Sequence, residues 1–174
     1  MRAAALGLLA AGTLSSCGYA LVGRGTVVDP SIKRIGVPLF RDAGTGKTSL
    51  DQKITQKVIE ELLKRGRFDV VQQATEVDAV VDGELLSYRS QAAALTGEAG
   101  QSAQASRYQI VLTARVKYSK TGATEAIWAN DSFSVQDEWD VGEASSFFDR
   151  EEQAIERLAG VFARNLVAAM MEAF

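Results

Sequence analysis

The stretch that decides the fold covers residues 32–71 and reads IKRIGVPLFRDAGTGKTSLDQKITQKVIEELLKRGRFDVV. Its first nine residues are rich in apolar β-formers and predict a strand, and Pro38 points to a sheet edge or a strand end. A polar loop with two glycines follows over 41–47. Residues 68–72 predict a second strand. A strand, a helix and a strand with short joints favour a right-handed parallel crossover.

The helix inside this stretch has clear start and stop signals. Thr48 or Ser49 can cap its first turn, and Gly66 can end it. Between them, apolar residues recur at spacings of four and make one helix face: Leu50, Ile54, Val58 and Leu62.

The chain beyond the crossover predicts more strands. Residues 77–88 form a third, where Gly83 breaks the alternation and suggests a bulge. Residues 91–106 are Ala, Gly, Gln and Ser without periodicity, and we expect a long mobile loop there. Residues 108–118 alternate apolar and polar side chains, as a half-buried antiparallel strand does. A further strand follows over 127–135.

A second helix is expected from about Asp149 almost to Phe174, because its apolar residues recur with helical period. Counting two of these five segments as one bent strand, the whole pattern predicts an α+β fold with a single mixed β-sheet of about four strands and two helices packed on one face. Trp128 is expected in the core. Trp139 has three acidic neighbours and is expected at a surface or interface.

Composition excludes several function classes. The chain has a net charge of −3, which argues against a nucleic-acid partner. It has no histidine and one cysteine, which removes the usual nucleophile–base pairs and zinc ligands. We therefore expect no enzyme, metal or cofactor. Asp82 and Glu84 lie two residues apart, and we interpret them as solvated strand charges rather than a catalytic pair.

The segment GTGKT at 44–48 looks briefly like a phosphate-binding loop. The full motif needs a glycine at position 41, where Arg41 stands, so nucleotide binding is not expected.

The N-terminus has the layout of an export signal, with Arg2, an apolar run and small residues before Cys17. The twelve residues from Ala3 to Leu14 are too few to span a bilayer, which needs about 20. The sequence LSSC at 14–17 resembles a bacterial lipobox. This resemblance implies removal of residues 1–16, attachment of lipid to Cys17 and, because Gly18 rather than Asp follows, an outer-membrane location.

The expected domain plan is then a signal peptide at 1–16, an acylated cysteine and tether at 17–31, and one α+β domain at 32–174. Several stretches of this plan resemble the lipopolysaccharide-assembly lipoproteins, the LptE family. They are CGY at 17–19 followed by Gly23, the strand and helix quoted above, DAVVDGELLSYRS at 78–90, TGATEAIWAN at 121–130 and DREEQAIERLA at 149–159.

This resemblance implies an outer-membrane lipoprotein that faces the periplasm and the lumen of a large β-barrel translocon. Such a protein binds inside the barrel, plugs it, and assists its assembly and the delivery of lipopolysaccharide. Lipopolysaccharide carries phosphates, for which basic side chains are natural contacts. The candidate contacts are Arg89, Arg107, Arg115 and Lys117.

The alternative function is an outer-membrane lipoprotein that activates a cell-wall synthase across the periplasm. Such activators share the strand, polar loop and helix opening. They usually have a long tether, whereas only about a dozen residues separate Cys17 from the first strand here, a reach of roughly 20 Å.

Overall fold

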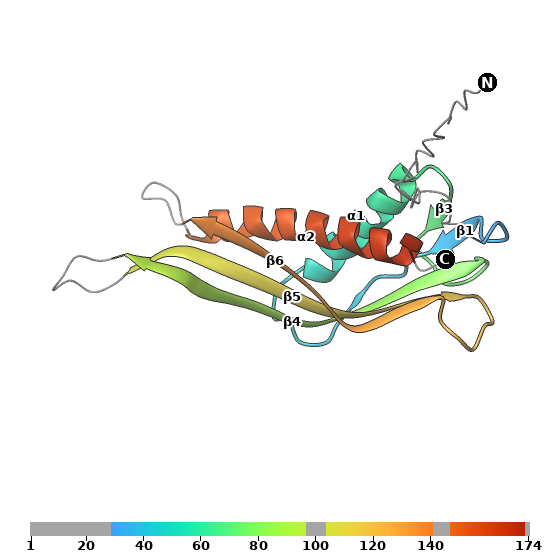
Figure 1. Cartoon of the computed structure of the whole chain (residues 1–174), viewed down its shortest axis with the longest axis horizontal. Helices are drawn as coiled ribbons and strands as arrows, with labels where there is room; N and C mark the ends of the chain where they lie inside the picture. Colours follow the sequence, from blue (N-terminus) through green and yellow to red (C-terminus); the bar gives the residue numbers. More distant parts are fainter. Residues whose placement is uncertain (1–28, 97–103, 141–146, 173–174) are drawn as a thin grey trace, which may run out of the picture.

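The computed structural model describes residues 29–96, 104–140 and 147–172 (Figure 1). Residues 1–28, which include the expected signal peptide, Cys17 and most of the tether, lie outside the described residues. The elements in chain order are β1 (Arg34–Gly36), β2 (Arg41–Asp42), α1 (Leu50–Lys64), β3 (Asp69–Val71), β4 (Ala79–Thr96), β5 (Gln104–Lys120), β6 (Trp128–Asp140) and α2 (Phe147–Glu172).

The strands form one mixed sheet in the order β3-β1-β4-β5-β6, and β2 also pairs with β4. β1 is parallel to β3 and β4, and β4, β5 and β6 are antiparallel neighbours. The α+β class and the parallel crossover through α1 are confirmed. The expected number of strands is corrected from about four to six.

The predicted strand 32–40 is shortened to β1, and β2 lies within residues 41–47, where a polar loop was expected, so that loop is corrected at its start. Pro38 has no N–H for a sheet ladder and lies between β1 and β2. Beyond it, the N–H of Phe40 donates to the Thr55 hydroxyl of α1 at 3.0 Å instead of to a strand. The ring of Phe40 packs against Gly83, where any Cβ would collide with it. Gly83 therefore serves a close approach, and the first bulge of β4 lies nearby, between Leu85 and Ser87.

The predicted loop 91–106 is wrong at both of its ends. Residues 91–96 belong to β4 and residues 104–106 to β5, and their pairing continues to Thr96 opposite Gln104. Two register shifts follow Ala92, within the run of small residues. Backbone pairing with β5 does not require bulky side chains, so the lack of periodicity did not prevent a strand. Residues 97–103 lie outside the described part of the chain.

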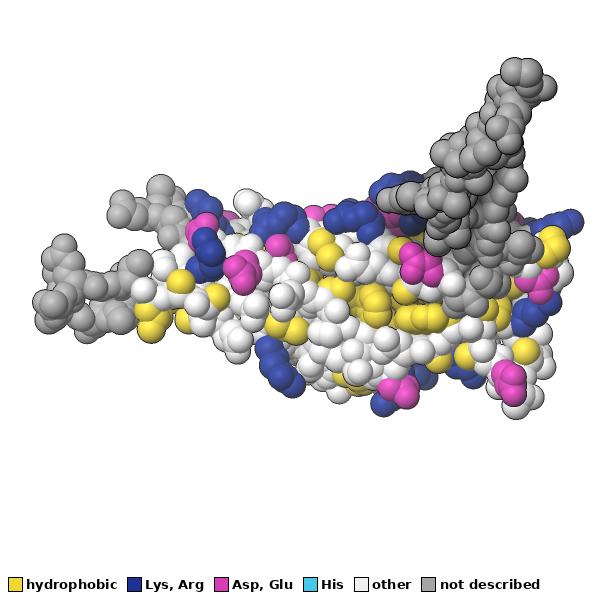
Figure 2. Space-filling view, viewed as in Figure 1, with side chains coloured by type: hydrophobic (Ala, Val, Ile, Leu, Met, Phe, Trp, Pro, Cys, Tyr) yellow, Lys and Arg dark blue, Asp and Glu magenta, His cyan; other side chains and the backbone are white. Residues whose placement is uncertain are grey.

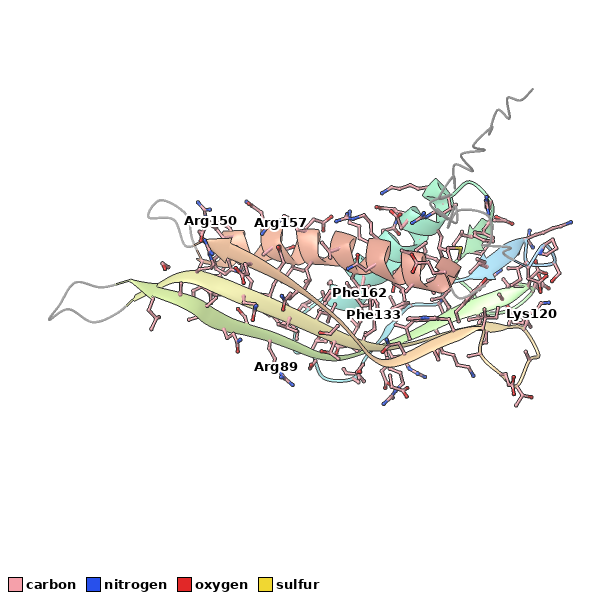
Figure 3. The ribbon with its side chains drawn as sticks, in the orientation of Figure 1. Arg89, Lys120, Phe133, Arg150, Arg157 and Phe162 are labelled. Carbon is pink, nitrogen blue, oxygen red and sulfur yellow. The ribbon has the colours of Figure 1, made fainter. Side chains whose placement is uncertain are left out.

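Both helices cover the same face of the sheet, as expected (Figure 1). Ser49 occupies the N-cap of α1 without a side-chain cap bond, and Gly66 follows its end with φ 65°. Phe162 of α2 lies at the centre of the core, with edge-to-face ring contacts to Phe40 at 6.2 Å and Phe133 at 5.2 Å. Figure 3 shows Phe133 and Phe162 between β6 and α2.

Of the two tryptophans, Trp139 differs from expectation. Trp139 is 6% exposed, stacks on Tyr108 at 5.1 Å and contacts Phe147, so its expected surface position is wrong. Its neighbours Glu138 and Asp140 misled that expectation, because successive residues of a strand face opposite sides of the sheet. Trp128 is half-buried and packs against the core.

The described chain begins at one end of the sheet. The Asp29 carboxylate accepts a hydrogen bond from Lys120, the last residue of β5, at 2.6 Å. The Asp78 carboxylate accepts from the backbone N–H groups of Lys33 and Arg34, both at 2.8 Å. These bonds hold the pKa values of both carboxyl groups below their usual range, with Lys120 the main cause for Asp29. These two carboxylates thus hold the first described residues against the end of the sheet.

Candidate functional site

The candidate site is the face of β4, β5 and β6 that the helices leave uncovered, called here the outer face (Figure 1). In β5, buried residues from Ile110 to Val116 alternate with residues that point outward, such as Thr113 and Arg115. The middle of the outer face is mostly uncharged and polar, with rows set by the strand pairing: Ser87, Thr113 and Ser134, then Gln91, Gln109 and Glu138.

Two of the four basic residues singled out in the sequence are neutralised by neighbours. Arg107 donates to Asp140 at 2.8 Å and lies 3.7 Å from Glu138. Its pKa is raised, mainly by the bond to Asp140. Arg115 contacts Glu84 at 2.6 Å and Asp131 at 3.4 Å. Both guanidinium groups therefore belong to ion-pair networks that cross the outer face.

The other two basic residues, Arg89 and Lys117, are exposed and make no hydrogen bond or ion pair within the described part of the chain. Figure 3 shows Arg89 pointing away from the helices. Arg89 pairs with Val111 and Lys117 with Asp82 in the β4–β5 register. Six residues of β5 thus separate them, which is roughly 20 Å at strand spacing. The four candidates form a line along the outer face and not a cluster.

Sequence reasoning missed the acidic partners of this line. Glu84 lies directly opposite Arg115, and Asp140 directly opposite Arg107. The signal was the matching of opposite charges between strands, which becomes readable only once the register is known.

The acidic pair considered for catalysis has no free carboxylates. Asp82 is 3.6 Å from Arg41, and Glu84 is bound to Arg115. Both face the open surface of the sheet, and Asp82 is half exposed. Their expected role as solvated strand charges fits this arrangement.

The loop 41–48 is closed on itself. The Asp42 carboxylate accepts hydrogen bonds from the N–H groups of Gly44 and Thr45 and from the Thr45 hydroxyl, at 2.7–2.9 Å. These bonds, first of all that of the Thr45 N–H, lower the pKa of Asp42. The amide groups that a phosphate would need are thus already satisfied by a carboxylate.

A buried charge lies at the junction of this loop with α2. Glu151, 6% exposed, accepts from the Lys47 ammonium at 2.8 Å and from the Tyr88 hydroxyl at 3.0 Å. The Lys47 ammonium also lies 5.0 Å from the centre of the Tyr88 ring. Burial and then Glu151 raise the pKa of Tyr88. These three side chains link the 41–48 loop, β4 and α2, so we assign them a structural role.

Two helices lie within residues 29–96, 104–140 and 147–172, and neither is both long and apolar enough to cross a membrane. The same residues contain no group of three or more side chains suited to hold a metal ion.

Solved structures share this fold at low sequence identity. Protein XCC0632 from Xanthomonas campestris aligns with a TM-score of 0.59 and 12% identity, over 82% of this chain and 85% of its own. The hypothetical protein CT253 from Chlamydia trachomatis gives 0.55 and 8%, over 82% and 97%. A minor lipoprotein from Acinetobacter baumannii gives 0.50 and 8%, over 81% and 94%. These likenesses concern the fold alone.

Among curated proteins, none matches the sequence significantly. The family described as lipopolysaccharide-assembly, LptE, matches residues 32–170. That range covers both helices almost completely and every strand of the described structure. The chain therefore belongs to the lipopolysaccharide-assembly family, LptE.

Proposed function

We propose that this chain is an outer-membrane lipoprotein that binds inside a large β-barrel translocon, assists its assembly and helps deliver lipopolysaccharide to the cell surface. Family membership supplies the link to lipopolysaccharide assembly. The observation that carries the proposal further is the outer face. Three long strands present a polar surface that no described helix covers, and the lumen of a membrane barrel is itself polar.

The lipid anchor is the second part of the proposal. Cys17 would carry acyl chains after removal of residues 1–16, and the tether would keep the domain close to the inner leaflet of the outer membrane. One acyl chain gives only marginal membrane binding, whereas several on one cysteine give stable anchoring. The domain needs no membrane-spanning helix in this arrangement.

Contact with lipopolysaccharide is the third part. A phosphate group gains most from a cation that has no carboxylate partner, because a paired cation must first give up its ion pair. Arg89 and Lys117 are therefore the leading contacts. Arg107 and Arg115 would contribute only after exchange of their acidic partners.

The first experiment is a partner pull-down. The full chain with a C-terminal tag is crosslinked in cells, the envelope is solubilised in mild detergent, and the co-purified proteins are identified. We expect one large outer-membrane β-barrel protein in near-equal amount. Recovery of a cell-wall synthase instead would favour the alternative function. Recovery of the chain alone would contradict the proposal that it binds a barrel.

The lipopolysaccharide contact has its own test. Binding of purified lipopolysaccharide is compared for the wild type, the double variant R89E/K117E and the control R67E, which changes an exposed charge between α1 and β3. We expect weaker binding by the double variant only. Equal binding by all three proteins would remove Arg89 and Lys117 from the site.

A further inference from the structure

A second polar surface lies on the opposite side of the molecule, between the two helices. A groove of about 400 Å³ separates α1 from α2 and reaches Asp137 of β6. Its described lining contains four basic and three acidic side chains. Figure 2 shows Lys and Arg side chains along the helix layer, at the top of the view.

The acidic side chains of the groove are already paired. Lys57 of α1 lies 2.7 Å from Glu156 of α2 and 3.5 Å from Glu60. Arg157 lies 2.9 Å from Asp137. Lys57 is the main cause of the lowered pKa of Glu156, so this carboxylate stays charged. The three acids are thus used by two of the four cations.

Arg164 is the exception among the basic side chains of the groove. Lys64, the remaining cation, lies 3.5 Å from Glu61 of its own helix. Arg164 makes no ion pair or hydrogen bond to any residue that the structure describes. It is a guanidinium at the wall of a groove, with five donors that need acceptors from water or from a ligand.

Gly160 makes room for this guanidinium. It lies in the middle of a 26-residue helix, where glycine is the poorest helix former apart from proline. A Cβ at this position would come 3.3 Å from Nη1 of Arg164. The guanidinium of the exposed Arg164 therefore lies over the bare backbone of the preceding turn, at the wall of the groove.

We infer that this groove docks one carboxylate side chain of a partner protein, held by Arg164. The net charge of the described lining is +1, which matches a single negative charge. A phosphate dianion would exceed this single positive charge, so a carboxylate fits better. A planar guanidinium also binds a carboxylate with two parallel hydrogen bonds.

This inference rests on the proposed function, which identifies the partner protein as the barrel. The docked carboxylate then belongs to an Asp or Glu on the wall of the barrel lumen. The groove lies on the helix side and the outer face on the opposite side of the sheet. Contacts on both sides are what a domain that fills a lumen requires. The groove therefore adds a second, charge-specific contact to the broad polar one.

The experiment uses the full chain in complex with its co-purified barrel. The variants are R164E, the matched charge reversal R67E, and G160A, which fills the space beneath the guanidinium. Retention of each by the barrel is measured as a dissociation constant, and thermal unfolding of each free chain is measured beside it. A photo-crosslinking residue at Val161, mapped by mass spectrometry, identifies what occupies the groove.

We expect R164E to weaken the complex by about tenfold or more, because a charge pair at an interface becomes a repulsion. R67E should change nothing. G160A should raise the melting temperature through better helix propensity and yet weaken the complex, a combination that a purely structural role would not give. The crosslink should map beside an acidic residue of the barrel.

Other outcomes overturn the inference. If the wild type holds the barrel and R164E holds it equally well, the groove is not a docking site, although the proposed function stands. If inorganic pyrophosphate, but not acetate, binds the free wild type and not R164E, the groove takes phosphate and the carboxylate assignment is wrong. If the wild type captures no barrel at all, the proposed function fails at the first step.

Discussion

The two faces of β5 share one backbone but differ in the exposure and the role of their side chains. On the side toward the helices, Leu112, Ala114 and Val116 are at most 1% exposed and contribute to one continuous core. On the other side, Thr113, Arg115 and Lys117 belong to the uncovered outer face. A strand can thus specify the fold with one set of alternate residues and leave the other set to contact a partner. Substitutions on the two faces should separate stability from binding.

The largest expected effect is on the core side, at Phe162. Phe162→Ala removes a ring that joins Phe40 and Phe133, and leaves a cavity between α2 and β6. We expect the free energy of unfolding to fall by about 3–5 kcal/mol. Chemical denaturation measures it, and a loss below about 1 kcal/mol would contradict the central place of this ring in the core.

The next effect tests a charge that lies within the covered layer. Glu151→Ala removes the acceptor of Lys47 and Tyr88 and leaves Lys47 without its partner. We expect a loss of about 2 kcal/mol, less than for a fully buried pair because Lys47 is one third exposed. Glu151→Gln keeps an acceptor for Tyr88 and should lose less. Equal losses in the two variants, measured by thermal unfolding, would show that the loss comes from the charge and that the acceptor kept for Tyr88 contributes nothing.

Gly83 tests how closely the core side is packed. Gly83→Ala places a methyl group where the Phe40 ring lies, so the segment between β1 and β2 must shift. We expect a loss of about 1–3 kcal/mol, in the range of overpacked cores. Gly122→Ala would be a poor control because of its positive φ, whereas Ser87→Ala on the outer face is a fair one. A neutral result for Gly83→Ala would contradict the close approach.

Elements with strong hydrophobic periodicity could be predicted from the sequence. Elements whose structure depends only on pairing with distant strands could not. Both helices, the crossover and the alternating strand 108–118 were expected at nearly their observed places. The small-residue ends of the β4–β5 hairpin and the two residues of β2 were not, because their structure comes from partners far along the chain. Membership of a non-enzymatic family confirms that the chain is not an enzyme.

The candidate site was predictable in its residue types but not in its charge balance. The four basic residues do lie on one face, as the strand period suggested for Arg115 and Lys117. Which of them are neutralised depends on the registers of β4 and β6 against β5, with a bulge opposite Arg115. No property of a single strand contains that information, so the pairing of Arg115 with Glu84 and of Arg107 with Asp140 was not predicted.

A smaller effect is expected in acid, at Asp78 near the end of the sheet. Its pKa is lowered by two backbone N–H donors, so its stabilising contribution is present above the usual pKa of aspartate. That contribution is lost as the pH falls through the lowered value. We expect the stability of the wild type to decline more steeply below about pH 4 than that of Asp78→Asn. Parallel acid-unfolding curves would contradict this role.

The smallest effect on stability is expected on the outer face. Thr113→Ala should change the free energy of unfolding by less than about 0.5 kcal/mol, as surface substitutions usually do. The same small effect on stability is expected for Arg89→Ala, although this variant should weaken the proposed binding of lipopolysaccharide. Denaturation of the two variants beside Phe162→Ala gives the comparison directly. A loss at Thr113 near that of Phe162 would show that the outer face is part of the folding core.

The charged attachment of Asp29 to Lys120 has a mechanical consequence. Under the proposed function, a lipid anchor at one end and a partner along the sheet would pull on the domain through its tether. Such a pull first meets the Asp29–Lys120 ion pair and then β1, whose parallel ladders span three residues with β3 and two with β4. The long β4–β5 hairpin, paired from Ala79 to Thr96, lies behind them. Under tension the domain would release its short parallel part first, while the strands that form the outer face stay joined.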